Sequence, residues 1–233
     1  MSALEAVVSR FGLTPAGAAA LHAVLELQGS DATAPTTVRD PDEAADRHVA
    51  DSLVALELPE VRAATRIADL GAGAGWPGLA LAAALPSARV ALVESAGRKC
   101  HYLERIIAAA GLGNAEVVHA RAEEWTAGLG AHDLVTARAL AALPVLCEYA
   151  APLLGLGGAL VAWKGAAAGA EVEAGDRAAA ELGLAAGRIH AVTPYPAAER
   201  RSLHVFVKVG PTPDRFPRRA GMAVKRPLGG QAG

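Results

Sequence analysis

Three alternating glycines directly after a short apolar segment constrain the fold of this chain more than any other feature of its sequence. The apolar segment is residues 66–70, the glycines are Gly71, Gly73 and Gly75, and a helical pattern begins near Pro77. Glycine lacks a Cβ, so the backbone can turn sharply and approach a ligand closely. The start of a helix points free N–H groups at that ligand. The passage predicts a strand, a tight loop and a helix, with a ligand at the carboxyl end of the strand.

Between residues 65 and 210, short apolar runs alternate with helical patterns. The expected strands are residues 66–70, 88–94, 116–120, 132–137, 159–163, 188–193 and 202–209. The expected helices between them are residues 77–84, 97–110, 143–154 and 171–182. Apolar strands that alternate with helices form a parallel sheet covered on both faces. We therefore expect an α/β fold with a Rossmann-like, mostly parallel seven-stranded sheet.

The alternation divides the chain into three parts. Residues 1–60 are expected to form an N-terminal helical extension packed on the core, whose third helix covers residues 40–58. Residues 61–210 form the α/β domain, and residues 211–233 form a basic tail. The tail holds one acidic residue against five basic ones, which are Arg215, Arg218, Arg219, Lys225 and Arg226.

Prolines and a glycine interrupt this tail, so we expect it to be extended and free of helix. An extended basic segment can follow a phosphate backbone. The alternative is that Phe216 and Leu228 pack the tail onto the domain.

The composition excludes several classes of protein. No stretch offers the roughly 20 apolar residues that a membrane span needs, and the N-terminus lacks a basic-then-apolar signal pattern. The two cysteines, Cys100 and Cys147, are too few for a disulfide scaffold and lack the spacing of metal ligands. We expect a cytoplasmic protein with no membrane segment and no metal site.

Two classes of cofactor use a glycine loop of this kind. Gly73, Gly75 and Gly78 match the dinucleotide fingerprint, with Glu94 near the expected spacing. That match begins two residues late and leaves Asp69 unexplained. An acid two residues before the first glycine is instead typical of S-adenosylmethionine proteins, where it can lie near the methionine amino group while Glu94 accepts the ribose hydroxyls. The pattern favours S-adenosylmethionine; a dinucleotide, or a plain strand–turn–helix corner, stays open.

Further motifs follow one another along nearly the whole chain. They are Val38-Arg39-Asp40-Pro41, Arg47-His48-Val49-Ala50-Asp51-Ser52-Leu53, the loop from Asp69 to Trp76-Pro77-Gly78, Ala120-Arg121-Ala122-Glu123-Glu124, Ala137-Arg138-Ala139, Trp163-Lys164-Gly165, Arg201-Ser202-Leu203-His204 and the basic tail. In this order they resemble the RsmG (GidB) family, the bacterial 16S rRNA guanine-N7 methyltransferases. The resemblance implies a class I S-adenosylmethionine-dependent methyltransferase fold, with residues 61–210 as the methyltransferase domain. It also implies methyl transfer to N7 of a guanine in the decoding-region loop of 16S rRNA.

The resemblance assigns expected roles to individual residues. Those expected to bind S-adenosylmethionine are Asp69, Gly71, Gly73, Gly75, Trp76, Glu94, Ala122, Glu123 and Arg138. Those expected to bind RNA are Arg47, His48, Lys164, Arg201, Arg215, Arg218, Arg219, Lys225 and Arg226. Arg138 is the expected positioning residue for catalysis. The expected partner is 16S rRNA, alone or within the small ribosomal subunit or an assembly intermediate, and the protein is expected to be a monomer.

The chemistry implied by the resemblance agrees with what the residues lack. N7 of guanine carries a lone pair and no proton, so in-line displacement requires alignment and no general base. The expected fourth strand ends in Thr136-Ala137-Arg138 and lacks the Asn/Asp-Pro-Pro-aromatic motif of amine methyltransferases. Neither cysteine lies in a loop suited to C5 methylation.

Three rival functions stay open. A small-molecule methyltransferase would share the glycine loop without needing the basic tail. A nicotinamide-dependent oxidoreductase would need a Tyr-Lys or His-Asp pair that the sequence does not offer convincingly. A non-catalytic RNA-binding protein would have little use for the intact glycine loop. Within the helical extension, the spacing of Arg47 and Asp51 allows an ion pair four residues apart; alternatively, this helix covers the donor pocket.

Overall fold

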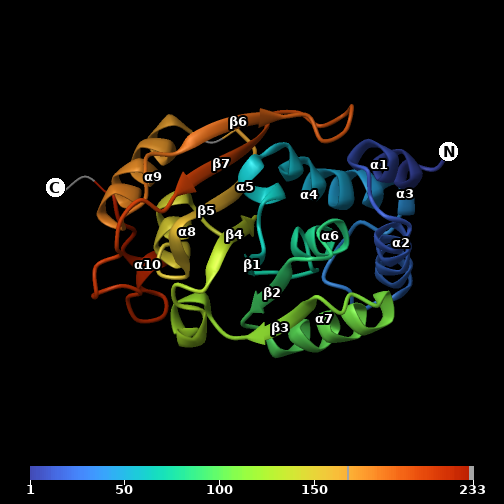
Figure 1. Ribbon diagram of the computed structural model, residues 1–233, viewed down its shortest axis with the longest axis horizontal. Helices are drawn as coiled ribbons and strands as arrows, with labels where there is room; N and C mark the ends of the chain where they lie inside the picture. Colours follow the sequence, from blue (N-terminus) through green and yellow to red (C-terminus); the bar gives the residue numbers. More distant parts are fainter. Residues whose placement is uncertain (167, 231–233) are drawn as a thin grey trace.

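A seven-stranded sheet in the order β3-β2-β1-β4-β5-β7-β6 forms the centre of the protein (Figure 1). The computed structural model describes residues 1–166 and 168–230. The strands are β1 (Arg66–Leu70), β2 (Arg89–Glu94), β3 (Ala115–His119), β4 (His132–Arg138), β5 (Leu154–Lys164), β6 (Arg188–Val192) and β7 (Arg201–Val207). Each overlaps a predicted strand, and the expected Rossmann-like α/β fold is confirmed.

Strand direction determines which residues meet at the carboxyl edge of the sheet. Strands β3, β2, β1, β4 and β5 pair in parallel, so all five end at one edge. Strand β7 runs antiparallel to both β5 and β6. The beginning of β7 at Arg201 therefore lies beside the end of β5 at Lys164, which is paired with Ser202.

Helices cover both faces because neighbouring residues of each strand point in opposite directions. On one face of the sheet, Ile67 and Leu134 pack with α6, with α7 and with the helices of the N-terminal extension. On the other face, Ala68 and Val135 pack with α8 and α9. The α-helices are α1 (Ala3–Phe11), α2 (Pro15–Ser30), α3 (Pro41–Ala44), α4 (Asp51–Leu53), α5 (Pro59–Arg62), α6 (Gly78–Ala84), α7 (Gly97–Ala110), α8 (Leu143–Ala150), α9 (Gly169–Glu181) and α10 (Met222–Lys225). None that the structure describes is long and apolar enough to cross a membrane.

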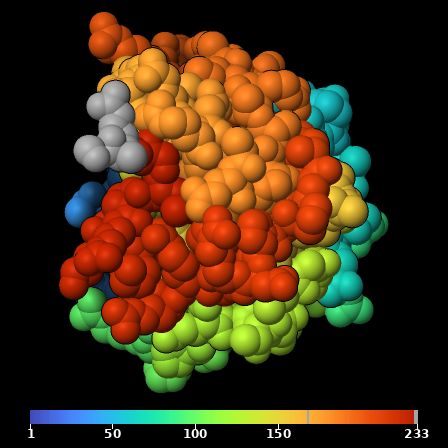
Figure 2. Space-filling model, turned by 90° about the vertical axis from the view of Figure 1, so that its left-hand side faces the viewer, coloured from blue at the N-terminus to red at the C-terminus, as the bar shows by residue number. Residues whose placement is uncertain are grey.

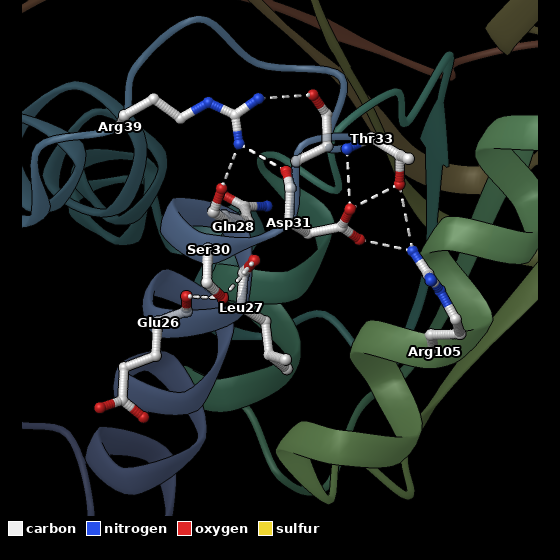
Figure 3. A network of polar contacts seen from close by, with 9 residues as sticks. Glu26, Leu27, Gln28, Ser30, Asp31, Thr33, Arg39 and Arg105 are labelled. Carbon is white, nitrogen blue, oxygen red and sulfur yellow. Dashed lines mark hydrogen bonds and ion pairs between the residues drawn. The ribbon is translucent and has the colours of Figure 1, made fainter.

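A polar network joins the end of α2 to α7 (Figure 3). Asp31 Oδ2 lies 2.5 Å from Arg105 Nη2, and the Asp31 Oδ1 atom accepts from the backbone N–H of Thr33 at 2.7 Å. Arg39 Nη1 donates to the carbonyl oxygens of Gln28 and Asp31, each at 2.6 Å. These bonds fix the polar linker after α2 against the α/β domain.

The prediction of one regular helix over residues 40–58 is wrong. Helix α3 passes into a π-helical turn at Ala45–Ala50, then into α4 and a 3₁₀ turn at Val54–Glu57. Two carbonyl oxygens of this segment accept hydrogen bonds from side chains of the sheet: Arg138 Nη1 donates to Arg47 O at 3.3 Å, and Trp163 Nε1 donates to Asp51 O at 2.7 Å. Hydrogen bonds from the sheet therefore replace part of the regular α-helical hydrogen bonding. Such π-helical turns occur frequently at functional sites.

Residues 211–230, which we call the C-terminal strap, lie on the outside of the α8–α9 layer (Figure 2). The expectation that this segment is free of helix is wrong, since Met222–Lys225 form α10. Phe216 is buried and belongs to the core under α8 and α9. Burial of this aromatic side chain stabilises the packing of the strap against the domain. The structure thus shows the alternative in which the tail packs onto the domain.

Candidate functional site

The glycine loop after β1 has the backbone that its sequence demands. Gly71, Gly73 and Gly75 have φ angles of 66°, 59° and 101°, in the left-handed region that favours glycine. A Cβ on Gly75 would lie 2.2 Å from Leu79 Cδ1, whereas one on Gly73 would meet nothing closer than the Gly71 carbonyl oxygen at 3.6 Å. Gly73 is therefore required by its backbone angle, and the space above it is open.

Asp69 lies beneath this loop and ties it to the sheet. Its Oδ2 atom accepts from Gly78 N at 3.0 Å, and its Oδ1 atom accepts from Thr136 Oγ1 at 2.8 Å. The side chain is only 1% exposed, and burial raises the pKa of Asp69 to about 6 against the lowering effect of these hydrogen bonds. The structure gives Asp69 a clear role in holding the loop; its contact with a donor amino group stays a prediction.

A cavity of about 330 Å³, the glycine-loop cavity, opens at the ends of β1, β2 and β3. It brings together four of the predicted donor residues, which are Gly71, Glu94, Ala122 and Glu123. Glu94 Oε2 accepts from Gly73 N at 3.1 Å, and its Oε1 atom accepts from Ala96 N at 2.8 Å. The carboxylate thus fixes the loop and stands in the cavity wall, with Lys99 Nζ at 3.9 Å.

Trp76 and Gln28 form a buried contact next to this loop. Trp76 does not line the glycine-loop cavity; its ring stacks on His48 with centroids 5.5 Å apart, and its Nε1 atom donates to Gln28 Oε1 at 3.0 Å. Gln28 Nε2 donates to Ala74 O at 2.7 Å. Gln28 is 1% exposed, and the sequence analysis missed it. The only available signal was a polar residue on an apolar helix face.

A second cavity of about 430 Å³, the arginine cavity, lies on the other side of the β4 end. It brings together five predicted residues, which are Arg47, His48, Arg138, Lys164 and Arg201. Ala139 lines both cavities and has a φ angle of 54°. A non-glycine residue in this region is strained, and such strain clusters at functional sites. The two cavities therefore meet at one residue.

The arginine cavity is organised around Asp51, which the sequence analysis did not assign to the site. Asp51 Oδ2 lies 2.9 Å from Arg138 Nη1, and Asp51 Oδ1 lies 3.5 Å from Arg201 Nε. The ion pair of Asp51 with Arg47, one of the two alternatives that the spacing left open, is not formed; Arg47 pairs with Glu43 at 2.5 Å instead. One carboxylate facing two guanidinium groups leaves the cavity with an excess of positive charge.

His48 and Lys164 complete this wall. Burial, and secondarily the Arg138 charge, lower the pKa of His48 to about 4, so its imidazole is neutral near pH 7. His48 Nδ1 lies 3.5 Å from Arg138 Nη2, and its Nε2 atom lies 3.0 Å from Thr36 Oγ1. Since a guanidinium can only donate, Nδ1 is the acceptor. Lys164 Nζ donates to Ala141 O at 2.8 Å and pairs with Glu171 at 2.7 Å.

The basic residues of the strap lie elsewhere. Arg215 pairs with Glu181 at 2.8 Å, and Arg218 pairs with Glu148. The other three, Arg219, Lys225 and Arg226, are exposed. None of the five lines the arginine cavity, so the structure does not gather the predicted RNA-binding residues into one place.

The strand order, the glycine loop and the acid at the end of β2 define a class I S-adenosylmethionine-dependent methyltransferase. Solved structures support this fold. One is an S-adenosylmethionine-dependent methyltransferase, SibL, with a TM-score of 0.57 and 18% identity, covering 68% of this chain and 55% of that chain. Another is a 16S rRNA (adenine(1408)-N(1))-methyltransferase from Catenulisporales acidiphilia with cosubstrate SAM, with a TM-score of 0.55 and 19% identity, covering 65% and 88%.

Sequence comparison identifies the family. The GidB family model, described as rRNA small subunit methyltransferase G, matches residues 26–201, and this chain belongs to that family. A protein named ribosomal RNA small subunit methyltransferase G from Rubrobacter xylanophilus is 43% identical over 198 residues, covering 82% of this chain and 76% of the relative. A protein of the same name from Symbiobacterium thermophilum is 36% identical over 219 residues, covering 89% and 88%. The family resemblance drawn from the motifs is confirmed.

Proposed function

We propose that this protein transfers the methyl group of S-adenosylmethionine to N7 of a guanine in the 16S rRNA of the small ribosomal subunit. The observation that carries the proposal is the meeting of two cavities at Ala139. One cavity has the glycine loop and carboxylate suited to the methyl donor. The other has the cationic and neutral hydrogen-bonding groups suited to a nucleotide. Family membership supports the same pairing of donor and acceptor.

The residues of the glycine-loop cavity fit the donor. Gly73 leaves open space above the loop. Glu94 presents a carboxylate, which would accept hydrogen bonds from the ribose hydroxyls. Ala122 and Glu123 follow β3 and would contact the adenine, with Tyr149 and Leu140 as nonpolar parts of the wall. When bound, S-adenosylmethionine supplies a methyl carbon on a positively charged sulfur.

The residues of the arginine cavity suit a guanine nucleotide. Arg138 can donate to guanine O6 or to a phosphate. A donor at N7 would occupy the attacking lone pair, so the proposed role of Arg138 requires that it does not bond to N7. No proton has to leave N7 before transfer, so the neutral His48 is not needed as a base. Arg138 is held by Asp51 and the Arg47 carbonyl, which fixes its direction before the nucleotide enters. Positioning of this kind supplies a large part of the rate.

The three parts of the chain divide these tasks. The N-terminal extension supplies Arg47, His48 and Asp51 to the arginine cavity. Residues 61–210, as the methyltransferase domain, carry the glycine loop and the meeting point at Ala139. We place the reaction in the cytoplasm, carried out by a monomer on 16S rRNA within the small subunit or an assembly intermediate.

The deciding experiment is mass mapping of 16S rRNA from cells with and without this protein. We expect one guanine to lose its N7 methyl group in the cells that lack it, and to regain it when the wild-type gene is returned. Return of the Gly73→Val variant, which has an obstructed loop, is the matched control and should not restore it. An identical methylation map in both cell types would overturn the proposal.

A further inference from the structure

The C-terminal strap is fastened to the domain by a buried ion pair. Arg218 Nε donates to Glu148 Oε1 at 2.7 Å, and Arg218 Nη2 contacts Glu148 Oε2. Glu148 belongs to α8 and is only 2% exposed. Among the described residues, Arg218 is the only ion-pair partner of this carboxylate. Loss of Arg218 would therefore leave an uncompensated charge inside the α8 layer.

A second fastening reaches the glycine-loop cavity itself. The backbone N–H of Gly221 donates to Glu123 Oε1 at 2.9 Å, and Glu123 lines that cavity. Glu148, which Arg218 holds, directly precedes Tyr149 on α8, and Tyr149 also lines this cavity. The strap thus contacts the cavity wall at Glu123 and is bonded to the helix that supplies Tyr149.

The strap between these points is anchored by its own packing. Phe216 is buried against α8 and α9, and the Arg215 and Arg218 guanidinium carbons lie 4.9 and 5.9 Å from its ring centroid. Arg218 Nη2 also donates to Arg226 O at 2.9 Å, and this bond joins the two halves of the strap. Figure 2 shows the red strap spread between the orange α9 region and the yellow-green segments below it.

We propose that Arg218 is a positioning residue for the methyl donor: by neutralising Glu148 it holds the strap and α8 in the arrangement that presents Glu123 and Tyr149 to S-adenosylmethionine. This inference rests on the proposed function, because the ligand of the glycine-loop cavity is taken to be the donor. It differs from the RNA role predicted for the same side chain. Because the Arg218 guanidinium is bonded to the buried Glu148, it stabilises the wall of the donor cavity and does not bind the RNA phosphates.

The test compares Arg218→Ala with Arg219→Ala in the full-length protein. Arg219 is the matched control because it belongs to the same strap, carries the same charge and has an exposed side chain. S-adenosylhomocysteine is titrated by calorimetry at a temperature where circular dichroism shows each variant folded. We expect Arg218→Ala to bind it about tenfold more weakly, since a buried pair has lost one partner, and Arg219→Ala to bind it as the wild type does.

Two further measurements separate positioning from general destabilisation. At saturating donor, the kcat of Arg218→Ala should equal that of the wild type while its KM for the donor rises. Adding Glu148→Gln to Arg218→Ala removes the buried charge and should recover donor affinity. If Arg218→Ala does not fold, Arg218→Lys takes its place; lysine cannot form both contacts, so a severalfold loss of donor affinity is still expected.

The outcomes keep this inference distinct from the proposed function. Donor affinity equal to the wild type in a folded Arg218→Ala or Arg218→Lys variant overturns the positioning role. So does a changed salt dependence of RNA binding with donor affinity unchanged, which would return Arg218 to the RNA site. Failure of the wild-type protein to bind S-adenosylhomocysteine at all would instead contradict the proposed function.

Discussion

Asp51 Oδ2 lies 2.9 Å from Arg138 Nη1 and thereby joins the N-terminal extension to the end of β4. Both side chains are largely withdrawn from solvent, which makes the pair less open to screening than a surface ion pair. The contact fixes the direction of the guanidinium within the arginine cavity, one residue before Ala139, where the two cavities meet. A group from the extension thus controls the direction of the central cation of the site.

Replacing Arg138 tests that arrangement. If Arg138 positions guanine, Arg138→Ala should lower turnover on the order of a hundredfold, as loss of a preorganised donor does, with donor affinity within a few-fold of the wild type. If it holds the donor carboxylate instead, donor affinity should fall by about 1–2 kcal/mol. Steady-state kinetics and calorimetric titration of S-adenosylhomocysteine on the same variant distinguish the two roles. Wild-type values in both would leave Arg138 with no part in the reaction.

Gly73→Val should abolish donor binding. The φ angle of 59° is unfavourable for a β-branched residue, and the new side chain would fill the open space above the loop. We also expect a loss of about 1–2 kcal/mol in the free energy of unfolding. Calorimetry with S-adenosylhomocysteine and a melting curve measure both effects. Gly113→Ala is the control, since Gly113 has no neighbour within 4 Å of a built Cβ; donor binding by Gly73→Val would contradict the assignment of the loop.

Gln28→Met should weaken both the fold and donor binding. The substitution keeps the size of the side chain but removes the partners of Ala74 O and Trp76 Nε1. Buried groups left unpaired cost about 1–3 kcal/mol, and the loop that carries them should become less ordered. Urea unfolding and donor titration measure the two effects. Ser30→Ala is a suitable control, because within the part of the chain that the structure describes the Ser30 hydroxyl bonds only to carbonyls of its own helix (Figure 3).

Asp69→Asn should change how stability depends on pH. The ordinary carboxyl pKa of 3.8 applies to the unfolded chain, whereas burial raises the pKa of Asp69 to about 6 in the fold. Between these values the folded protein keeps a proton that the unfolded chain releases. The stability from this group is therefore full below about pH 3.8 and is lost as the pH rises through about 6.

An asparagine at position 69 stays neutral, so the variant does not lose this stability as the pH rises. The variant should gain stability relative to the wild type as the pH rises from 4 to 7, on the order of 2–3 kcal/mol in total. Chemical denaturation at several pH values measures the difference, and a gap that stays constant with pH would contradict the raised pKa. A donor titration at pH 7.5 adds a second result: weaker binding by Asp69→Asn is expected if the carboxylate attracts the donor amino group.

The fold, and the site residues at the ends of the strands, could be predicted from the sequence for one physical reason. Parallel strands end at a common edge, so residues at successive strand ends, such as Glu94, Ala122, Arg138 and Lys164, could be placed together without coordinates. The same reasoning cannot predict contacts between the helical extension and the sheet. Gln28 and Asp51 reach the site from the helical extension, and nothing in their local pattern says which loop or strand they meet.

Two other differences have the same origin. The sequence of the tail shows five cations and Phe216 as a candidate for burial. It does not reveal that Arg218 binds the buried Glu148 or that the backbone N–H of Gly221 donates to Glu123. The helix at residues 40–58 had a regular pattern, and its π-turn accompanies bonds from Arg138 and Trp163 that lie far away in the chain. Tertiary hydrogen bonds overrode local preference in both places.

The reversed direction of β7 has a consequence for the order in which the protein becomes functional during synthesis. The glycine loop is translated in the first third of the chain, whereas Arg201 reaches the arginine cavity only because the last strand begins at the carboxyl edge. The strap that contacts Glu123 follows later still. A polypeptide interrupted after β5 would already contain the loop that faces the methyl donor, yet it would lack one wall of the neighbouring cavity. Completion of the arginine cavity is therefore tied to completion of the chain.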